Sequence, residues 1–168
     1  MAEKEIFVVR ELASLPGYSE SINADEILRR LEKVVCDRGA ELYVVSEIRE
    51  LLKDISWADP NPVDCERGQL TEIVDHKKIV DALTKSGRQP HCAIGNAMRM
   101  VFNGVATGVL DEVGGILVYL DHKNDGEDLC LELRRRGDGI MILDVRKVVS
   151  IREFHQRYSI LLLKKENK

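Results

Sequence analysis

Residues 114–149 constrain the fold most, because three strand-like segments follow one another there with a turn between each pair. The turns fall at 124–126 and 137–139, and both contain Asp-Gly, a pair that favours tight hairpins. Segments 116–120 and 140–145 are apolar on both faces, so we expect them to be covered on both sides. Segment 129–133 carries its leucines on one face only. The pattern predicts a three-stranded antiparallel meander.

Helices are expected mainly in the first two-thirds of the chain. One should run from Asn23 to Gly39, because Asn23 begins a capping-box pattern and Gly39 suits the left-handed residue that ends a helix. Two more are expected, over 76–85 and over 90–104, the last with Pro90 in its first turn. All three have apolar residues spaced to form a single buried stripe.

Together these elements predict an α+β fold with a C-terminal antiparallel β-meander of about four or five strands, covered by three or four helices from the N-terminal two-thirds. Runs 6–9 and 158–163 predict an early and a late strand. A chain of 168 residues suits a single domain over 1–168, helix-rich in 1–104 and strand-rich in 114–163.

Two segments in the first half are harder to interpret. Residues 41–55 fit either one helix or a short strand followed by a helix capped by Ser46. The second interpretation would suit a helix-turn-helix, but this half of the chain is acidic where contacts with DNA phosphates need Lys and Arg. The Pro-containing segment 56–68 predicts a long loop, with Trp57 as an anchor in the core.

Charge and cysteine content suggest a cytoplasmic protein with reduced thiols. The four cysteines are widely spaced, and the first residues lack the basic start and apolar stretch of a secretory signal. The longest apolar run, 160–163, is too short to cross a membrane. The formal net charge is −4, yet residues 129–168 carry ten Lys or Arg against five Asp or Glu. A basic segment can bind anions, or it can be an ordinary solvated surface.

Cys92 is the candidate nucleophile of the chain. If Pro90 began a helix, Cys92 would lie in its first turn, where the helix dipole favours a thiolate. A thiol-dependent enzyme would also need a base: His91 is adjacent in sequence, and His76 or His122 could be brought close by the fold. Cys92, His91 and His76 form the candidate catalytic site. The alternative is structural, because a small cysteine is often packed beneath a sheet.

Four cations form the candidate anion-binding site. Arg134, Arg135 and Arg136 precede a hairpin turn, and Lys147 follows the next strand. Such a cluster could bind phosphate or nucleic acid, although aromatic partners for stacking are few. A solvated hairpin tip that resists aggregation explains the same residues.

No metal or cofactor is expected. His and Cys residues that could bind zinc lack the close C-x2-C type of spacing of structural zinc sites. The loop at 121–132 matches the calcium-loop pattern only in part. Phosphate-binding loops, dinucleotide fingerprints, G-x-S-x-G and HExxH are absent from the sequence.

The sequence therefore favours a non-catalytic binding or regulatory module that acts through protein–protein contacts. A thiol-dependent enzyme centred on Cys92 is the alternative, and a nucleic-acid- or phosphate-binding protein comes third. We also expect a homo-oligomer, specifically a homodimer, because the apolar run at 158–163 must be central in the sheet or paired across a two-fold axis.

Overall fold

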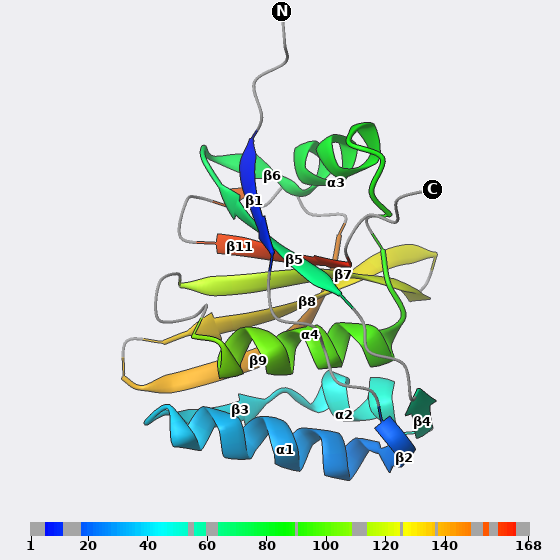
Figure 1. Ribbon diagram of the computed structural model, residues 1–168, viewed down its shortest axis with the longest axis vertical. Helices are drawn as coiled ribbons and strands as arrows, with labels where there is room; N and C mark the ends of the chain where they lie inside the picture. Colours follow the sequence, from blue (N-terminus) through cyan, green and yellow to red (C-terminus); the bar gives the residue numbers. More distant parts are fainter. Residues whose placement is uncertain are drawn as a thin grey trace, which may run out of the picture.

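The computed structural model describes residues 6–11, 18–53, 56–59, 64–89, 91–108, 114–124, 126–136, 138–148, 153–154 and 158–163 (Figure 1). In this part of the chain, no helix combines the length and the apolar character that crossing a bilayer requires.

The main sheet of the described residues has seven strands in the order β1-β5-β11-β7-β8-β9-β3. β7, β8 and β9 pair antiparallel, whereas β11 runs parallel to β7 and β3 parallel to β9, so the sheet is mixed. Two small sheets pair β2 with β4 and β6 with β10. The strands are β1 (Phe7–Glu11), β2 (Tyr18–Asn23), β3 (Glu41–Val44), β4 (Ser56–Asp59), β5 (Cys65–Leu70), β6 (Val74–Asp75), β7 (Gly115–Asn124), β8 (Glu127–Arg135), β9 (Ile140–Lys147), β10 (Glu153–Phe154) and β11 (Tyr158–Leu163).

The described residues form four helices, and these are interleaved with the strands along the chain. They are α1 (Ala24–Asp37), α2 (Ser46–Leu52), α3 (His76–Lys85) and α4 (Ile94–Ala106). The fold is α+β, but the predicted C-terminal antiparallel meander covered by N-terminal helices is wrong. Three of the seven strands, β1, β3 and β5, come from the N-terminal half, and two of the strand pairings are parallel.

Capping signals in the sequence predicted the ends of α1 correctly and the start of α4 incorrectly. The Asn23 side chain accepts a hydrogen bond of 3.0 Å from the Glu26 N–H, and Gly39 follows α1 with a φ of 78°. Both features confirm the predicted helix. α4 begins at Ile94, so the expected start at Pro90 is wrong and Cys92 precedes the helix.

Each of the two segments that were hard to interpret contains a short strand. Residues 41–44 form β3 and Ser46–Leu52 form α2, so the strand and helix of the second interpretation are confirmed. The predicted cap is wrong, because Ser46 is the first residue of the helix and the N-cap is Val45, without a side-chain capping bond. The predicted loop over 56–68 is wrong in the described residues, because it contains β4 and the start of β5. Trp57 lies in β4, opposite Ile22 of β2.

β7 lies at the centre of the core and is buried on both faces, as its sequence predicts. Its first face, with Val118, packs in an apolar cluster with residues of α1, α2 and α4. Its second face, with Leu117 and Tyr119, packs in a separate cluster with Ile79 and Leu83 of α3. α4 packs on β7, and Figure 1 shows α3 at the other end of the molecule beside β6.

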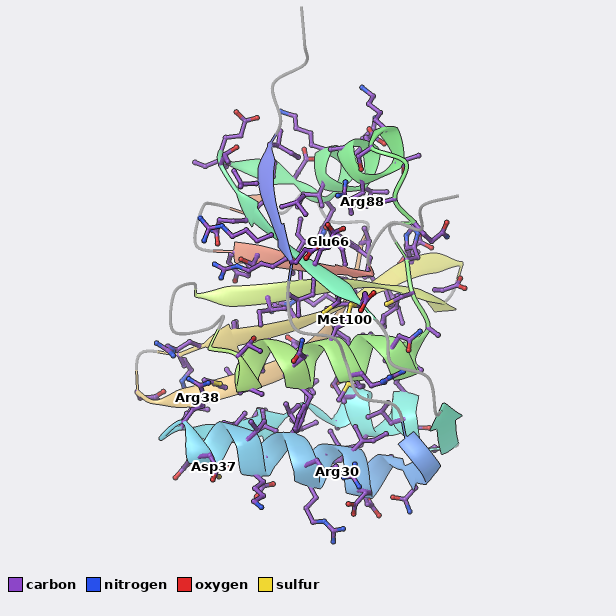
Figure 2. All side chains as sticks on the ribbon, viewed as in Figure 1. Arg30, Asp37, Arg38, Glu66, Arg88 and Met100 are labelled. Carbon is purple, nitrogen blue, oxygen red and sulfur yellow. The ribbon has the colours of Figure 1, made fainter. Side chains whose placement is uncertain are left out.

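An ion pair fastens the end of α3 to the sheet. The Glu66 carboxylate of β5 lies 3.3 Å from Nε of Arg88, and both side chains are mostly buried. Figure 2 shows the two residues at this end of the molecule, while Arg30 and Asp37 lie on the side of α1 away from the sheet. Arg88 therefore balances the charge of Glu66, a mostly buried carboxylate in β5.

β11 lies inside the sheet, between β5 and β7. Ile160 and Leu162 pack in the second cluster and Leu161 in the first, so the strand is buried on both faces. This position accounts for the apolar run at 158–163 without a second chain. The apolar run at 158–163 therefore gives no reason to expect a homodimer.

Removal of residues 158–168 should unfold the protein rather than release a stable monomer. The truncation would delete Ile160, Leu161 and Leu162, whose burial contributes about 1.5–3 kcal/mol each, against a typical stability of about 5–15 kcal/mol. Circular dichroism and the dispersion of amide NMR signals would show the loss of structure. Truncation after Leu163 is the control and should keep the native spectrum; a folded 1–157 fragment would contradict this position for β11.

Candidate functional site

Cys92 lies in an extended segment that pairs with the end of β7. Its N–H donates to the Tyr119 carbonyl at 3.1 Å, and its own carbonyl accepts from the Asp121 N–H at 2.6 Å. The thiol donates weakly to the Tyr119 carbonyl, with 3.6 Å between sulfur and oxygen. Burial, assisted by the charge of Asp121, raises the pKa of Cys92 to about 12. The thiolate needed for a nucleophile is therefore strongly disfavoured at neutral pH.

The two candidate histidines meet at the side chain of Tyr119. Nδ1 of the buried His76 lies 2.9 Å from the Tyr119 hydroxyl. The Tyr119 ring is approached edge-on by His76 at 5.6 Å and by His91 at 6.4 Å between ring centroids. His91 Nε2 lies 3.7 Å from a carboxylate oxygen of Asp128. The polar partner of the Cys92 thiol is thus a backbone carbonyl and not an imidazole.

In the described residues, no group of three or more His, Cys, Asp or Glu side chains is arranged to hold a metal ion.

The four predicted anion-binding cations do not form one site. Arg134 and Arg135 are neighbours in β8 and so point to opposite faces, and Lys147 pairs with Leu129, five positions along the ladder from Arg134. At about 3.4 Å per residue, that is roughly 17 Å. Three of the cations already have carboxylate partners: Arg134 with Asp144, Arg136 with Asp138, and Lys147 with Glu127.

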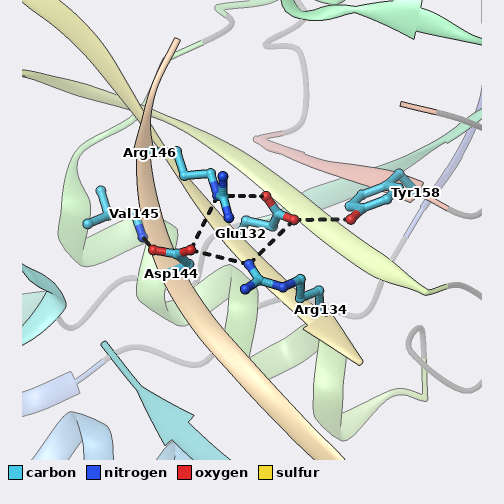
Figure 3. Close-up of polar contacts among 6 residues, drawn as sticks. All are labelled: Glu132, Arg134, Asp144, Val145, Arg146 and Tyr158. Atoms are coloured by element: carbon cyan, nitrogen blue, oxygen red, sulfur yellow. Dashed lines mark hydrogen bonds and ion pairs between the residues drawn. The ribbon is translucent and has the colours of Figure 1, made fainter. Parts of the chain in front are cut away.

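The structure instead brings together a different group, here called the charged cluster. Its members come from β8, β9 and the start of β11, and Figure 3 shows them converging: Glu132, Arg134, Asp144, Arg146 and Tyr158. Both guanidinium groups reach the same oxygen of Asp144, Arg134 through Nη1 and Arg146 through Nε, each at 3.2 Å. The Tyr158 hydroxyl donates to Glu132 at 3.0 Å.

Strand register explains why these side chains meet. Glu132 is directly opposite Asp144 in the β8–β9 ladder, so both carboxylates project from the second face of the sheet. Two carboxylates in facing positions repel each other. Arg134 and Arg146 flank them on the same face, because side chains two positions apart in a strand share a face. Their contacts balance the two negative charges with two positive charges.

Glu132 is the centre of the charged cluster, and its side chain is fully buried. Its two carboxylate oxygens lie 3.8 Å from Arg134 and 3.7 Å from Arg146. Burying a carboxylate costs roughly several kcal/mol of hydration free energy, which nearby charges and hydrogen bonds must offset. Here two guanidinium groups and the Tyr158 hydroxyl do so.

A glycine lets Tyr158 reach the charged cluster across β7. Gly115 pairs with Tyr158 on one side and with Arg134 on the other. A Cβ at Gly115 would lie 2.8 Å from Cδ1 and 2.9 Å from Cζ of the Tyr158 ring, closer than real Cβ contacts allow. The ring therefore lies over Gly115, with its hydroxyl directed at Glu132.

The charged cluster continues into an exposed surface at the β3 end of the sheet. Tyr43 of β3 pairs with Ile142 of β9, which pairs with Arg134 of β8, so the three share a row and a face. Tyr43 is 60% exposed. The Arg146 and Arg134 side chains are 45% and 28% exposed. The second apolar cluster takes no residue from β9 or β3 in the described part of the chain. We call this surface, made of Tyr43, Arg134, Asp144 and Arg146 around the buried Ile142, the open face.

Comparison with known proteins provides no further identification: no family model, curated protein or solved structure matches the chain.

Sequence analysis missed Glu132, Asp144 and Tyr158 as site residues, although a signal for the first two was present. Both interrupt strands that are otherwise largely apolar. A hairpin turn centred on Asp138 places Glu132 opposite Asp144, as the structure has it. Tyr158 had no comparable signal, because its position depends on the pairing of β11 with β7.

Substitution of Gly115 by Ala should destabilise the protein by about 1–3 kcal/mol, the usual cost of overpacking. The new methyl group would displace the Tyr158 ring and break its hydrogen bond to Glu132. Urea denaturation of Gly115→Ala, Tyr158→Ala and the double variant would measure the coupling between the two residues. The methyl group should cost much less when Tyr158 is Ala; equal costs in both backgrounds would rule out this contact.

Cys36 should be the most reactive of the four cysteines in the native protein. Cys36 is exposed, while burial raises the pKa of Cys65 and Cys92 and the Cys130 thiol is also buried. Brief alkylation with iodoacetamide between pH 6 and 9, followed by peptide mass spectrometry, should label Cys36 first and label Cys92 only after unfolding in urea. Rapid labelling of native Cys92 near pH 6 would instead favour the thiol-dependent enzyme.

Proposed function

We propose that the protein is a non-catalytic binding or regulatory module that acts through protein–protein contacts, and that the open face is its contact surface. The exposure of Tyr43 on the same face of the sheet as two partly exposed arginines is the observation that carries this proposal. Tyrosine and arginine are enriched among the residues that contribute most to binding at protein interfaces.

The surroundings of Tyr43 suit a role in recognition. Side chains fixed in advance lose less conformational entropy on binding than side chains that must become ordered. Arg134 and Arg146 are held by Glu132 and Asp144, and Glu132 is held in turn by Tyr158. A partner would thus meet a surface in which an exposed tyrosine shares a face of the sheet with positioned guanidinium groups.

The two other functions have less support. A thiol-dependent enzyme requires a thiolate, and burial raises the pKa of Cys92 to about 12. Binding of nucleic acid requires cations that are available for phosphates. Arg134, Arg136 and Lys147 each pair with a carboxylate, and Arg134 and Lys147 lie five positions apart along the ladder.

A photo-crosslinking amino acid at position 43 would test the proposal. Ile73 supplies the matched control, because it is 61% exposed, nearly the same as Tyr43, and lies immediately before β6. After irradiation in an extract of the native host, the probe at position 43 should give a discrete protein adduct that the probe at position 73 does not.

The adduct should also depend on the charged cluster. Arg146→Ala removes a partly exposed guanidinium, and it should reduce the yield of the adduct while the circular dichroism spectrum stays native. An adduct that forms equally from positions 43 and 73, or that Arg146→Ala leaves unchanged, would contradict a specific contact at the open face.

A further inference from the structure

β1 is the last strand at one end of the seven-stranded sheet, and β5 is its ladder partner. The Thr71 N–H donates to the Ile6 carbonyl at 2.8 Å, so the backbone polar groups of Ile6 point toward β5. In an antiparallel ladder these directions alternate along the strand. The N–H and C=O groups of Val8 therefore also point toward β5. Those of Phe7 and Val9 point away from the sheet.

Val8 occupies an unusual place on this edge. It is one of the three large apolar side chains that stand out as exposed in the described residues, at 49%. Natural edge strands are commonly protected by a charged residue or a proline near the middle. In β1 the charged residues Arg10 and Glu11 occupy the second half of the five-residue strand, so Phe7-Val8-Val9 is the part of the edge without charge or proline.

We propose that β1 is a self-association edge, which pairs antiparallel with β1 of a second copy of this chain across a two-fold axis at Val8. In this register Phe7 of one chain is opposite Val9 of the other, and their outward N–H and C=O groups bond in both directions. The two Val8 side chains meet at the axis in a non-hydrogen-bonded pair, where Cα atoms approach to about 4.5 Å. The two main sheets become one continuous sheet.

A second copy fits this edge because antiparallel pairing about one residue is self-complementary, as a two-fold interface requires. The contact is small, since a strand of five residues spans only about 17 Å. Stable dimers bury roughly 1,200–2,000 Å². The association is therefore weak and depends on concentration.

The opposite end of the sheet is less suited to this pairing. Leu42 and Val44 of β3 pack with Val34 of α1 against the first cluster, and Figure 1 shows α1 lying along that end of the sheet. A further strand beside β3 would meet the helix. The β1 contact is also separate from the open face at β3, so either proposal can fail without the other.

Opposite charges at position 8 provide the test. Val8→Lys and Val8→Glu each place two like charges at the axis, and each should raise the dimer Kd by roughly 5-fold or more. In an equimolar mixture the two variants should form a heterodimer, because Lys of one chain then faces Glu of the other. Ile73→Lys is the control and should associate as the wild type does.

Analytical ultracentrifugation of the full chain from micromolar to millimolar concentration measures these constants, and native mass spectrometry distinguishes the heterodimer by mass. The wild type should rise from the 19.0 kDa chain mass toward twice that value. A wild type that stays monomeric overturns the proposal, even if a foreign extended peptide binds β1. Variants that associate normally, or a mixture of weakened variants that forms no heterodimer, overturn it as well.

Discussion

The buried carboxylate of Glu132 holds together three strands that are distant in the sequence. It receives the Tyr158 hydroxyl from β11 and lies between the guanidinium groups of Arg134 on β8 and Arg146 on β9. A lone carboxylate at this position would lose its hydration without compensation. The strands must therefore be in register before Glu132 can be buried, and this requirement favours the native pairing over a register shifted by one residue.

The second face of the sheet is divided between apolar and polar surface for a related reason. Apolar contacts with α3 cover the region around Leu117 and Tyr119, where the Tyr119 hydroxyl is bonded to the buried His76. Beyond that region, β8 and β9 carry charged side chains on the same face, and these are paired with one another. A polar surface that satisfies its own charges can border water without needing another helix.

Much of the local structure was predictable from the sequence, whereas the topology was not. α1 was predicted from Asn23 and Gly39, because caps and glycine conformation act within a few residues. β5 was missed because its sequence is polar: Arg67 bonds to Ser159 of the neighbouring strand at 3.1 Å, a partner 92 positions away. The three strands β7, β8 and β9 pair antiparallel in sequence order, as the predicted three-stranded meander requires. The larger C-terminal antiparallel sheet was wrong, since the insertion of β11 between β5 and β7 depends on long-range pairing that no local pattern records.

The candidate site illustrates how pairing changes the meaning of a basic segment. The excess of Lys and Arg after residue 129 suggested an anion-binding site, yet the folded chain joins Arg134 and Arg146 to the same carboxylate. A bare basic patch attracts any polyanion and releases it as salt rises. A balanced cluster has little long-range attraction, so its selectivity has to come from contact geometry. Under the function proposed above, Tyr43 and the fixed orientation of the guanidinium groups would supply this selectivity, and a shaped protein surface would suit them better than a nucleic acid.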